Sequence, residues 1–224
     1  MRSFEKILDL ASQHYGGAKG VKAKLGEHPH ILDLSILSDD RVLAEMTRRI
    51  FQSGFVWKVI DAKWEGFEAA FDGFDPHRVA FYSDEDLDRL MGDTRIVRNG
   101  AKIAATLHNA RFVVEVAKEA GSFCAFLANW PSDDQIGLLE VMKARGKRLS
   151  GMTGQYFLRF IGWDAFILSN DVSAALIREG VVDKPPTSKA AMKAVQAAFN
   201  EWADQSGRPR REISRVLALS IGPS

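Results

Sequence analysis

Cysteine is nearly absent from this sequence, since Cys124 is the only one in 224 residues. A single thiol excludes an internal disulfide and any zinc site with several cysteine ligands, and it suits a reducing cytoplasm. No apolar run approaches the roughly 18 residues that a membrane helix needs. The start of the chain carries charges at Glu5, Lys6 and Asp9, so we expect no signal peptide and a cytoplasmic protein.

An excess of either charge is also missing. The formal net charge is +1, from 30 basic and 29 acidic residues. A surface that binds nucleic acid must therefore be local rather than spread over the whole protein. Hydrophobic residues make up 46% of the chain, which is enough for a sizeable core, and the 26% of charged residues is ordinary for a soluble protein.

Strand pairs, repeats and low-complexity tracts are not evident, and helical periodicity runs through most of the chain. Asp39 and Asp40 begin a predicted helix that reaches about Ala62, with Gly54 as a place for a kink. A loop is expected over 16–20. Further helices are expected over 4–14, 64–71, 84–91, 98–119, 122–129, 132–144, 152–162, 170–178, 188–205 and 209–220. About ten helices without a sheet predict an all-α fold.

Local signals mark several helix starts. Asp75 before Pro76 is typical of an N-cap followed by a first-turn proline. Ser83 with Asp86, and Ser132 with Gln135, resemble capping boxes. These signals predict helix boundaries between which the rest of the pattern can be placed.

A glycine turn separates two of the predicted helices at 149–154. Glycines permit positive φ and close approach, and the backbone N–H groups at the start of the next helix form an anion site. Lys143 and Arg145 add positive charge just before it, which suits one phosphate of a DNA strand. A plain turn with a solvated basic face is the alternative. The residues expected to hold the DNA backbone are Lys147, Arg148, Leu149, Ser150, Gly151, Met152, Thr153 and Gly154.

Two resemblances extend this interpretation. The stretch RLSGMTGQYFLRFIGWDAFILSND, from residue 148, resembles the helix-hairpin-helix signature of the DNA glycosylase superfamily. Within 39–130, the stretches QSGFVWKVI, FEAAFDGFDPHRVA, DEDLDRLMGDTRIVRNGAKIAATLHNAR and GSFCAFLANW resemble the 3-methyladenine DNA glycosylase I family in order, spacing and apolar frame.

The resemblance implies a helix-hairpin-helix DNA glycosylase fold of two packed lobes within one unit, 1–224. Residues 39–130 would form one lobe, and 132–182 would hold the hairpin. Residues 1–38 and 183–224 would complete the second lobe.

The implied function is that of a monofunctional DNA glycosylase in base excision repair, which hydrolyses the N-glycosidic bond of alkylated purines such as 3-methyladenine. The base would be flipped out of the duplex and held against aromatic rings. Trp57 matches the stacking tryptophan of the family, although a core tryptophan is the alternative. Phe55 and Tyr156 would help to line the pocket, with Tyr15 as a further wall. A desolvated contact between a cationic base and such a ring is worth roughly 2 kcal/mol.

The sequence departs from the family at the acidic position that contacts the base. Arg49 aligns there, and Glu45 lies one helical turn before it, so we expect the two to pair. Glu45 and Asp171 are the acidic candidates for catalysis. Helix capping is the alternative role for Asp171, since Ser169 aligns with the catalytic aspartate of the superfamily.

Other absences concern a lysine and a metal. Gln155 and Tyr156 stand where bifunctional lyases carry a lysine, so we expect no lyase activity. The family has a zinc clip of two cysteines and two histidines, but the matching cysteines are missing, so we predict no metal and no cofactor. No trusted ligand spacing exists among the histidines, which are His14, His28, His30, His77 and His108.

We therefore expect a monomer that binds double-stranded DNA and no membrane. Two other functions stay open. One is a non-catalytic DNA- or lesion-binding protein on a glycosylase fold, which Arg49 favours. The other is a helical interaction module without affinity for DNA, against which the basic turn speaks. Salt-dependent DNA binding would exclude the interaction module, and release of free base would identify the enzyme.

Overall fold

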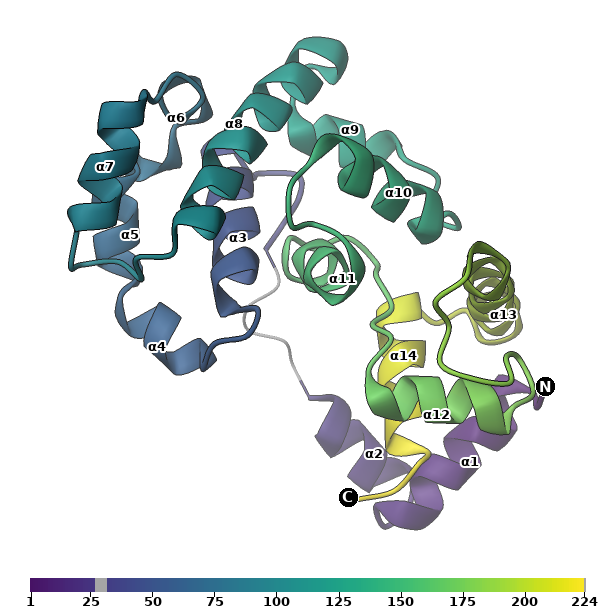
Figure 1. Cartoon of the computed structure of the whole chain (residues 1–224). Coiled ribbons are helices and arrows are strands. Elements are labelled where there is room, and N and C mark those ends of the chain that lie inside the picture. The colour runs from purple at the N-terminus through teal and green to yellow at the C-terminus, as the bar shows by residue number, and fades with distance from the viewer. Residues whose placement is uncertain (27–31, 224) are drawn as a thin grey trace. The chain divides into compact units, whose positions relative to one another are not determined.

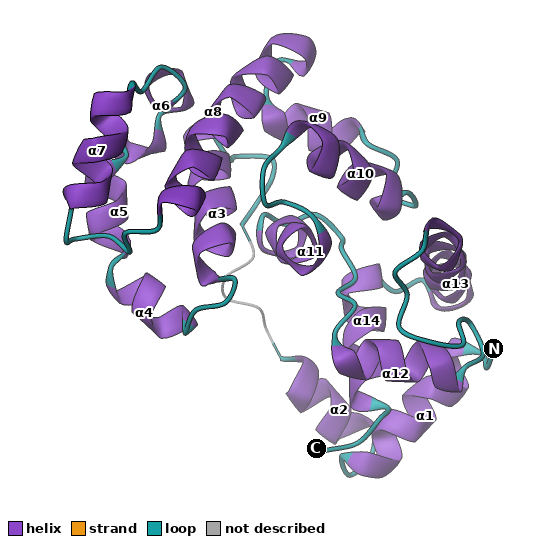
Figure 2. Cartoon of the chain, viewed as in Figure 1, coloured by secondary structure: helices purple, strands orange, loops and turns teal. Residues whose placement is uncertain are grey.

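The computed structural model describes residues 1–26 and 32–223, and within them every regular element is a helix (Figures 1 and 2). The predicted all-α class is confirmed. The described residues form fourteen α-helices and one short 3-10 helix, more than the ten or so expected. They also include no helix that is long and apolar enough to cross a membrane.

One compact unit comprises residues 32–130 and 138–163. Its long helix α8 packs against α3, α6 and α9, and α3 also packs against α11 (Figure 1). Stacked rings, including those of Trp64, Phe67, Phe71 and Phe74, fill its core. Its helical elements are α3 (Asp39–Gln52), α4 (Trp57–Ala62), α5 (Trp64–Ala70), η1 (Asp72–Phe74), α6 (Pro76–Val79), α7 (Asp84–Gly92), α8 (Gly100–Ala120), α9 (Phe123–Asn129) and α11 (Gly151–Phe160).

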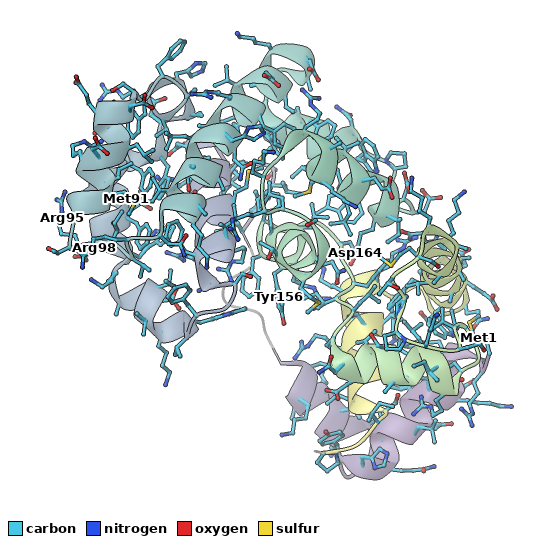
Figure 3. The ribbon with its side chains drawn as sticks, in the orientation of Figure 1. Met1, Met91, Arg95, Arg98, Tyr156 and Asp164 are labelled. Carbon is cyan, nitrogen blue, oxygen red and sulfur yellow. The ribbon has the colours of Figure 1, made fainter. Side chains whose placement is uncertain are left out.

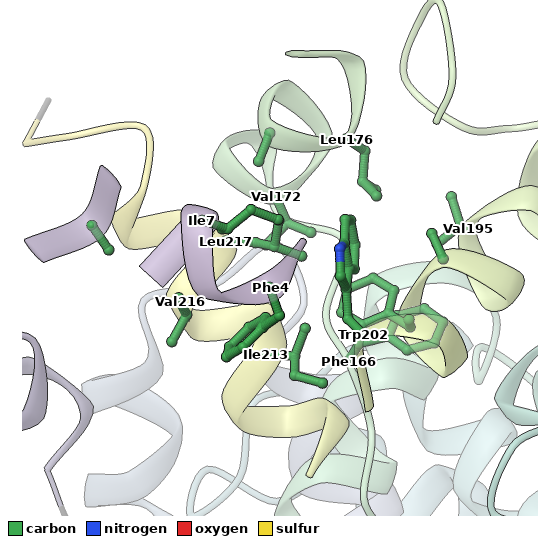
Figure 4. Packing of buried hydrophobic residues seen from close by; sticks show 14 of the residues in the cluster. Phe4, Ile7, Phe166, Val172, Leu176, Val195, Trp202, Ile213, Val216 and Leu217 are labelled. Carbon is green, nitrogen blue, oxygen red and sulfur yellow. The ribbon is translucent and has the colours of Figure 1, made fainter. Parts of the chain in front are cut away.

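The other unit comprises residues 1–31, 131–137 and 164–224, of which 27–31 and 224 lie outside the described residues. Figure 4 shows its core, where Trp202 and Phe166 meet aliphatic side chains of the surrounding helices. Asp164, labelled in Figure 3, accepts hydrogen bonds from the backbone N–H groups of Arg210 and Arg211 and so caps the last helix. The helices of this unit are α1 (Phe4–His14), α2 (Ala18–Leu25), α12 (Asn170–Arg178), α13 (Lys189–Ser206) and α14 (Arg210–Leu219).

The hairpin region predicted over 132–182 divides between the two units. Helix α10 (Gln135–Arg145) begins in the unit that holds the termini, and its remainder and α11 belong to the unit of α3 and α8. The segment after Trp163 returns to the unit of the termini. The turn between α10 and α11 is therefore supported by the helices of 39–130.

Two predicted helix starts are confirmed. Asp75 accepts a hydrogen bond from the His77 N–H ahead of α6, whose first residue is Pro76. Ser83 and Asp86 form a capping box at α7. In both places the signal is local, so the sequence suffices to predict it.

Three other local predictions are wrong. The helix expected to continue from 39 to about 62 is two helices, α3 and α4, although they separate at Gly54, the position considered for a kink, where φ is 74°. Part of the loop expected over 16–20 is helical, since α2 begins at Ala18. Ser132 does not cap α10. Asp134 does, accepting the Gly137 N–H at 2.9 Å.

Candidate functional site

The turn between α10 and α11 presents free backbone donors. Ser150 is the N-cap of α11, and its side chain makes no capping hydrogen bond. Ser150, Gly151 and Met152 are exposed, and the backbone N–H groups of Gly151, Met152 and Thr153 donate to no acceptor within the described residues. A helix start in this state attracts an anion, because unpaired N–H groups and the helix dipole point the same way.

Helix α8 fixes the shape of this turn. The buried Asn109 side chain donates to the Lys147 carbonyl oxygen at 3.0 Å and accepts from the Lys147 N–H at 2.8 Å. The preceding residue on α8, His108, has its Nε2 2.8 Å from the Arg145 carbonyl oxygen. Together these contacts hold the backbone on both sides of Gly146.

The two glycines of the motif have different roles. Gly151 is exposed, has φ of 58°, and would leave an added Cβ in open space. Gly154 is buried, and a Cβ there would lie 2.2 Å from the Leu149 carbonyl oxygen. Leu149 is itself fully buried. Leu149 and Gly154 therefore position the turn by packing, and their expected contact with the DNA backbone stays a prediction.

The basic residues around the turn fall into two groups, one paired with acidic side chains and one exposed. Arg145 is turned towards α8, where it bonds Glu119 at 2.7 Å and lies 3.6 Å from Glu115. Lys147 and Arg148 are exposed. They border a groove of about 410 Å³ along α8, which also includes His108 and Arg111. The positive charge left for a ligand is thus concentrated on Lys147, Arg148 and Arg111.

An aromatic cluster lies along α11 and the start of α4. Trp57 is 39% exposed and meets the Tyr156 ring edge-on at 5.3 Å. The ring centres of Phe160 and Trp57 are 6.1 Å apart. Figure 3 labels Tyr156 on α11. Trp57 is therefore not a buried core residue, and its role in stacking a base stays a prediction. Phe160 was not among the expected site residues, although its position four residues after Tyr156 places both on one helical face.

Glu45 and Arg49 form the expected pair. Arg49 Nε lies 2.6 Å from Glu45 Oε1, and both side chains are buried. The Arg49 guanidinium carbon lies 4.0 Å from the Phe160 ring centre and 5.2 Å from that of Trp57. Burial raises the pKa of Glu45 and lowers the pKa of Arg49, and the attraction between the two charges opposes both shifts.

Phe55 has a different neighbour. The Lys102 ammonium group lies 4.4 Å from the centre of its ring and donates hydrogen bonds to the carbonyl oxygens of Phe51 and Ser53. Burial, together with the positive charge of Arg148, lowers the pKa of Lys102 to about 8. Lys102 thereby satisfies the carbonyl groups at the end of α3, and Phe55, 40% exposed, covers it.

Asp171 lies in the other unit, where it is exposed in the first turn of α12. The capping role considered for it belongs to Ser169, whose hydroxyl accepts the Val172 N–H at 3.2 Å. Asp171 lines a pocket of about 330 Å³ with Tyr15, Lys24 and residues of α14. The structure thus brings Asp171 and Tyr15 together in one unit, whereas Trp57 and Glu45 belong to the other.

The cysteine and histidine side chains of this protein do not fit the zinc clip of the family that its sequence resembles. Cys124 is buried in α9, and burial, with the nearby charge of Asp39, raises the pKa of its thiol to about 11. A protonated thiol is a poor zinc ligand. Across 1–26 and 32–223, no three histidine, cysteine, aspartate or glutamate side chains gather as a metal site. His28 and His30 lie outside the described residues.

An exposed glycine turn that leads into a helix, within an all-helical fold, agrees with the expected helix-hairpin-helix DNA glycosylase fold. The model of the methyladenine glycosylase family matches residues 35–147, about half of the chain, so the chain belongs to that family.

Individual relatives agree with this assignment. DNA-3-methyladenine glycosylase 1 of Escherichia coli is 36% identical over 76 residues, which are 34% of this chain and 41% of that protein. A crystal structure of a 3-methyladenine DNA glycosylase I has a TM-score of 0.51 and 25% identity, over 60% of this chain and 82% of the other. The 3-methyladenine DNA glycosylase I of Staphylococcus aureus shares the fold, with a TM-score of 0.53 and 23% identity over 69% and 91% of the two chains.

Proposed function

We propose that this protein is a monofunctional DNA glycosylase of base excision repair, which hydrolyses the N-glycosidic bond of alkylated purines such as 3-methyladenine. The observation that carries the proposal is the exposure of Trp57, 39%, in a cluster with the half-buried rings of Tyr156 and Phe160. A partly exposed tryptophan in such a cluster suits a flat ring that has left the base stack. The names of its relatives in Escherichia coli and Staphylococcus aureus support the same substrate class.

Helix α11 would link the two halves of the site. It begins at the turn that would hold a phosphate and carries Tyr156 and Phe160 further along. At 1.5 Å per residue, Gly151 and Tyr156 are about 8 Å apart along the helix axis. A rigid helix of this kind fixes the separation between a gripped phosphate and an extruded base, so binding of the backbone would orient the base.

The reaction would need little from the protein besides orientation. When the purine carries a positive charge, the C1′–N bond breaks with its electron pair going to the base, which leaves neutral, and a water oxygen adds to C1′. Glu45 is held by Arg49, so we assign it the task of orienting that guanidinium. Asp171 is our candidate for stabilising the sugar cation or activating the water. Gln155 in place of a lysine supports hydrolysis without strand cleavage.

We infer further that the protein acts as a monomer on double-stranded DNA, in the cytoplasm and without a cofactor. The single, buried cysteine is compatible with a reducing compartment. The turn, its basic neighbours and the aromatic cluster all belong to one unit of one chain, so a partner subunit is not needed to complete this part of the site.

A base-release assay tests the proposal. The protein is incubated with dimethyl-sulfate-treated duplex DNA, and the freed bases are separated by chromatography. We expect free alkylated purines from the native protein and a loss of at least tenfold with Trp57→Ala. Phe81→Ala is the matched control, because Phe81 is 86% exposed in the same unit but outside the cluster. Equal release by the two variants would contradict the assignment of Trp57.

A non-catalytic lesion-binding protein is the second candidate, and the observation in its favour is Arg49. A guanidinium beside the rings would repel a cationic base, and its partner Glu45 is not available as a catalytic group. Such a protein would bind damaged duplexes more tightly than intact ones in a titration and release no base of any kind.

A further inference from the structure

We propose that Arg49 sets the choice of base: the site favours an uncharged purine adduct with hydrogen-bond acceptors on its edge over a cationic one. This inference rests on the proposed function, because it assumes that the base lies against Trp57. It names a narrower substrate class than alkylated purines as a whole. The argument has three parts, which concern unused donors, charge and the leaving group.

The first observation is that Arg49 has unused donors at the aromatic cluster. Its Nε is the atom nearest to Glu45, at 2.6 Å, and the two terminal nitrogens donate no hydrogen bond within the described residues. The guanidinium lies between the rings of Phe160, at 4.0 Å, and Trp57, at 5.2 Å. A purine stacked on the open face of Trp57 would therefore have N–H donors beside its edge, where ring nitrogens or an exocyclic oxygen can accept them.

The second observation concerns the charges around the guanidinium. Glu45 neutralises the pair as a whole, but it lies on the Nε side, so the positive end is the one that remains for the rings. Arg48 is stacked 4.1 Å from the Trp64 ring, and Asp61 accepts a hydrogen bond from the Gln52 side chain at 3.1 Å. Asp61 lies on α4 with Trp57, and its charge also attracts the Arg49 guanidinium, which is the cation that contacts the rings of Phe160 and Trp57. A cationic base would thus meet a like charge, which disfavours it.

The third part is the chemistry of the leaving group. When the C1′–N bond of an uncharged purine breaks, both electrons go to the base, which leaves as an anion. Water then adds its oxygen to C1′, and a proton from that water neutralises the base. Arg49 donors next to the purine would stabilise the developing anion. A cationic purine leaves neutral and gains nothing from them.

The test uses two substrates that differ in charge. One is a duplex with a single 1,N6-ethenoadenine, an uncharged adduct, and the other is duplex DNA that carries 3-methyladenine. Under single-turnover conditions we expect the native protein to release ethenoadenine at least tenfold faster. Arg49→Gln should reverse or abolish this preference. The double change Glu45→Arg with Arg49→Glu keeps a buried ion pair and moves the positive charge one turn away, and it should shift the ratio further towards 3-methyladenine.

Thermal unfolding by circular dichroism verifies that each variant is folded, and the double change serves if Arg49→Gln is not. If the native protein releases 3-methyladenine faster than ethenoadenine, the inference is overturned while the proposed function stands. If Arg49→Gln speeds the release of both bases equally, the guanidinium only fills the site, and the inference is also overturned. If neither base is released, the proposed function fails, and the inference fails with it.

Discussion

The side chains of Glu45 and Arg49 show how a buried ion pair depends on both members. Each charge is removed from water, and each is the other's main compensation. Removing one partner leaves an uncompensated charge, whereas replacing both with apolar groups removes the desolvation cost as well. The stability of α3 therefore depends on both members of the pair, and one of them, Arg49, also contacts the aromatic cluster.

We expect Glu45→Ala to lower the free energy of unfolding by about 3–5 kcal/mol, since it strands the Arg49 charge. The double change Glu45→Leu with Arg49→Met should cost less than the single change. Urea unfolding followed by circular dichroism measures both. A double variant less stable than Glu45→Ala would show that the pair contributes net stability, against this expectation.

Lys102 supplies a prediction about pH. Its pKa of about 8 lies below the ordinary lysine value of 10.5, because it is buried and close to Arg148. Between these values the unfolded chain binds a proton that the folded protein has released, so the contribution of Lys102 to stability rises with pH from about 8 to about 10.5.

A titration followed by the NMR signal of the Lys102 side chain should give a midpoint near 8 in the native protein. Arg148→Ala removes one cause of the shift, so the midpoint should move upward. In denaturant unfolding at pH 8 and at pH 10, Lys102→Met should lose the part of the pH dependence that this lysine supplies. An unchanged midpoint in Arg148→Ala would contradict the coupling.

Helix α11 contains two glycines with different surroundings. Its residue Gly154 lies against the Leu149 carbonyl, whereas Gly151 is open to solvent. We expect Gly154→Ala to lower the stability by about 1–3 kcal/mol, as overpacking does. Gly151→Ala should cost about 1 kcal/mol, from its left-handed backbone alone. Scanning calorimetry measures both changes, and a larger effect at Gly151 would contradict this distinction.

Helix starts with local signals could be predicted from the sequence, as Asp75 and Ser83 show. Others depend on distant residues. The Gln135 side chain exchanges two hydrogen bonds with the Phe166 backbone, so it is not used for capping. The end of α3 is held by Lys102, about fifty residues further along. Tertiary contacts of this kind hold the end of α3 next to Gly54, and periodicity does not contain them.

The residues of the candidate site also fall into two groups, those that the sequence predicts and those that depend on tertiary packing. Trp57 and the Glu45–Arg49 pair follow from helical spacing together with the family resemblance. Phe160 and the unused donors of Arg49 do not, because they require the packing of α3 against α11. The burial of Leu149 likewise depends on neighbours that a motif does not contain.

The whole protein has almost no net charge, so any DNA affinity must come from local groups. The logarithm of the binding constant falls with the logarithm of salt concentration by about 0.9 per phosphate contact. We expect the double change Lys147→Ala with Arg148→Ala to reduce this slope by about 2. Lys118→Ala with Arg78→Ala, two exposed basic residues elsewhere in the unit, is the control for net charge. Equal slopes for the two variants would exclude the turn as the DNA contact.

The two hydrogen bonds between the Asn109 side chain and the Lys147 backbone join residues that are thirty-eight positions apart in the chain. The conformation of the turn between α10 and α11 therefore depends on contacts with α8, which comes earlier in the chain. A synthetic peptide of 143–160 would lack that brace and should lose the geometry. A transfer of this turn to another scaffold should therefore include a counterpart of Asn109 as well as the two glycines.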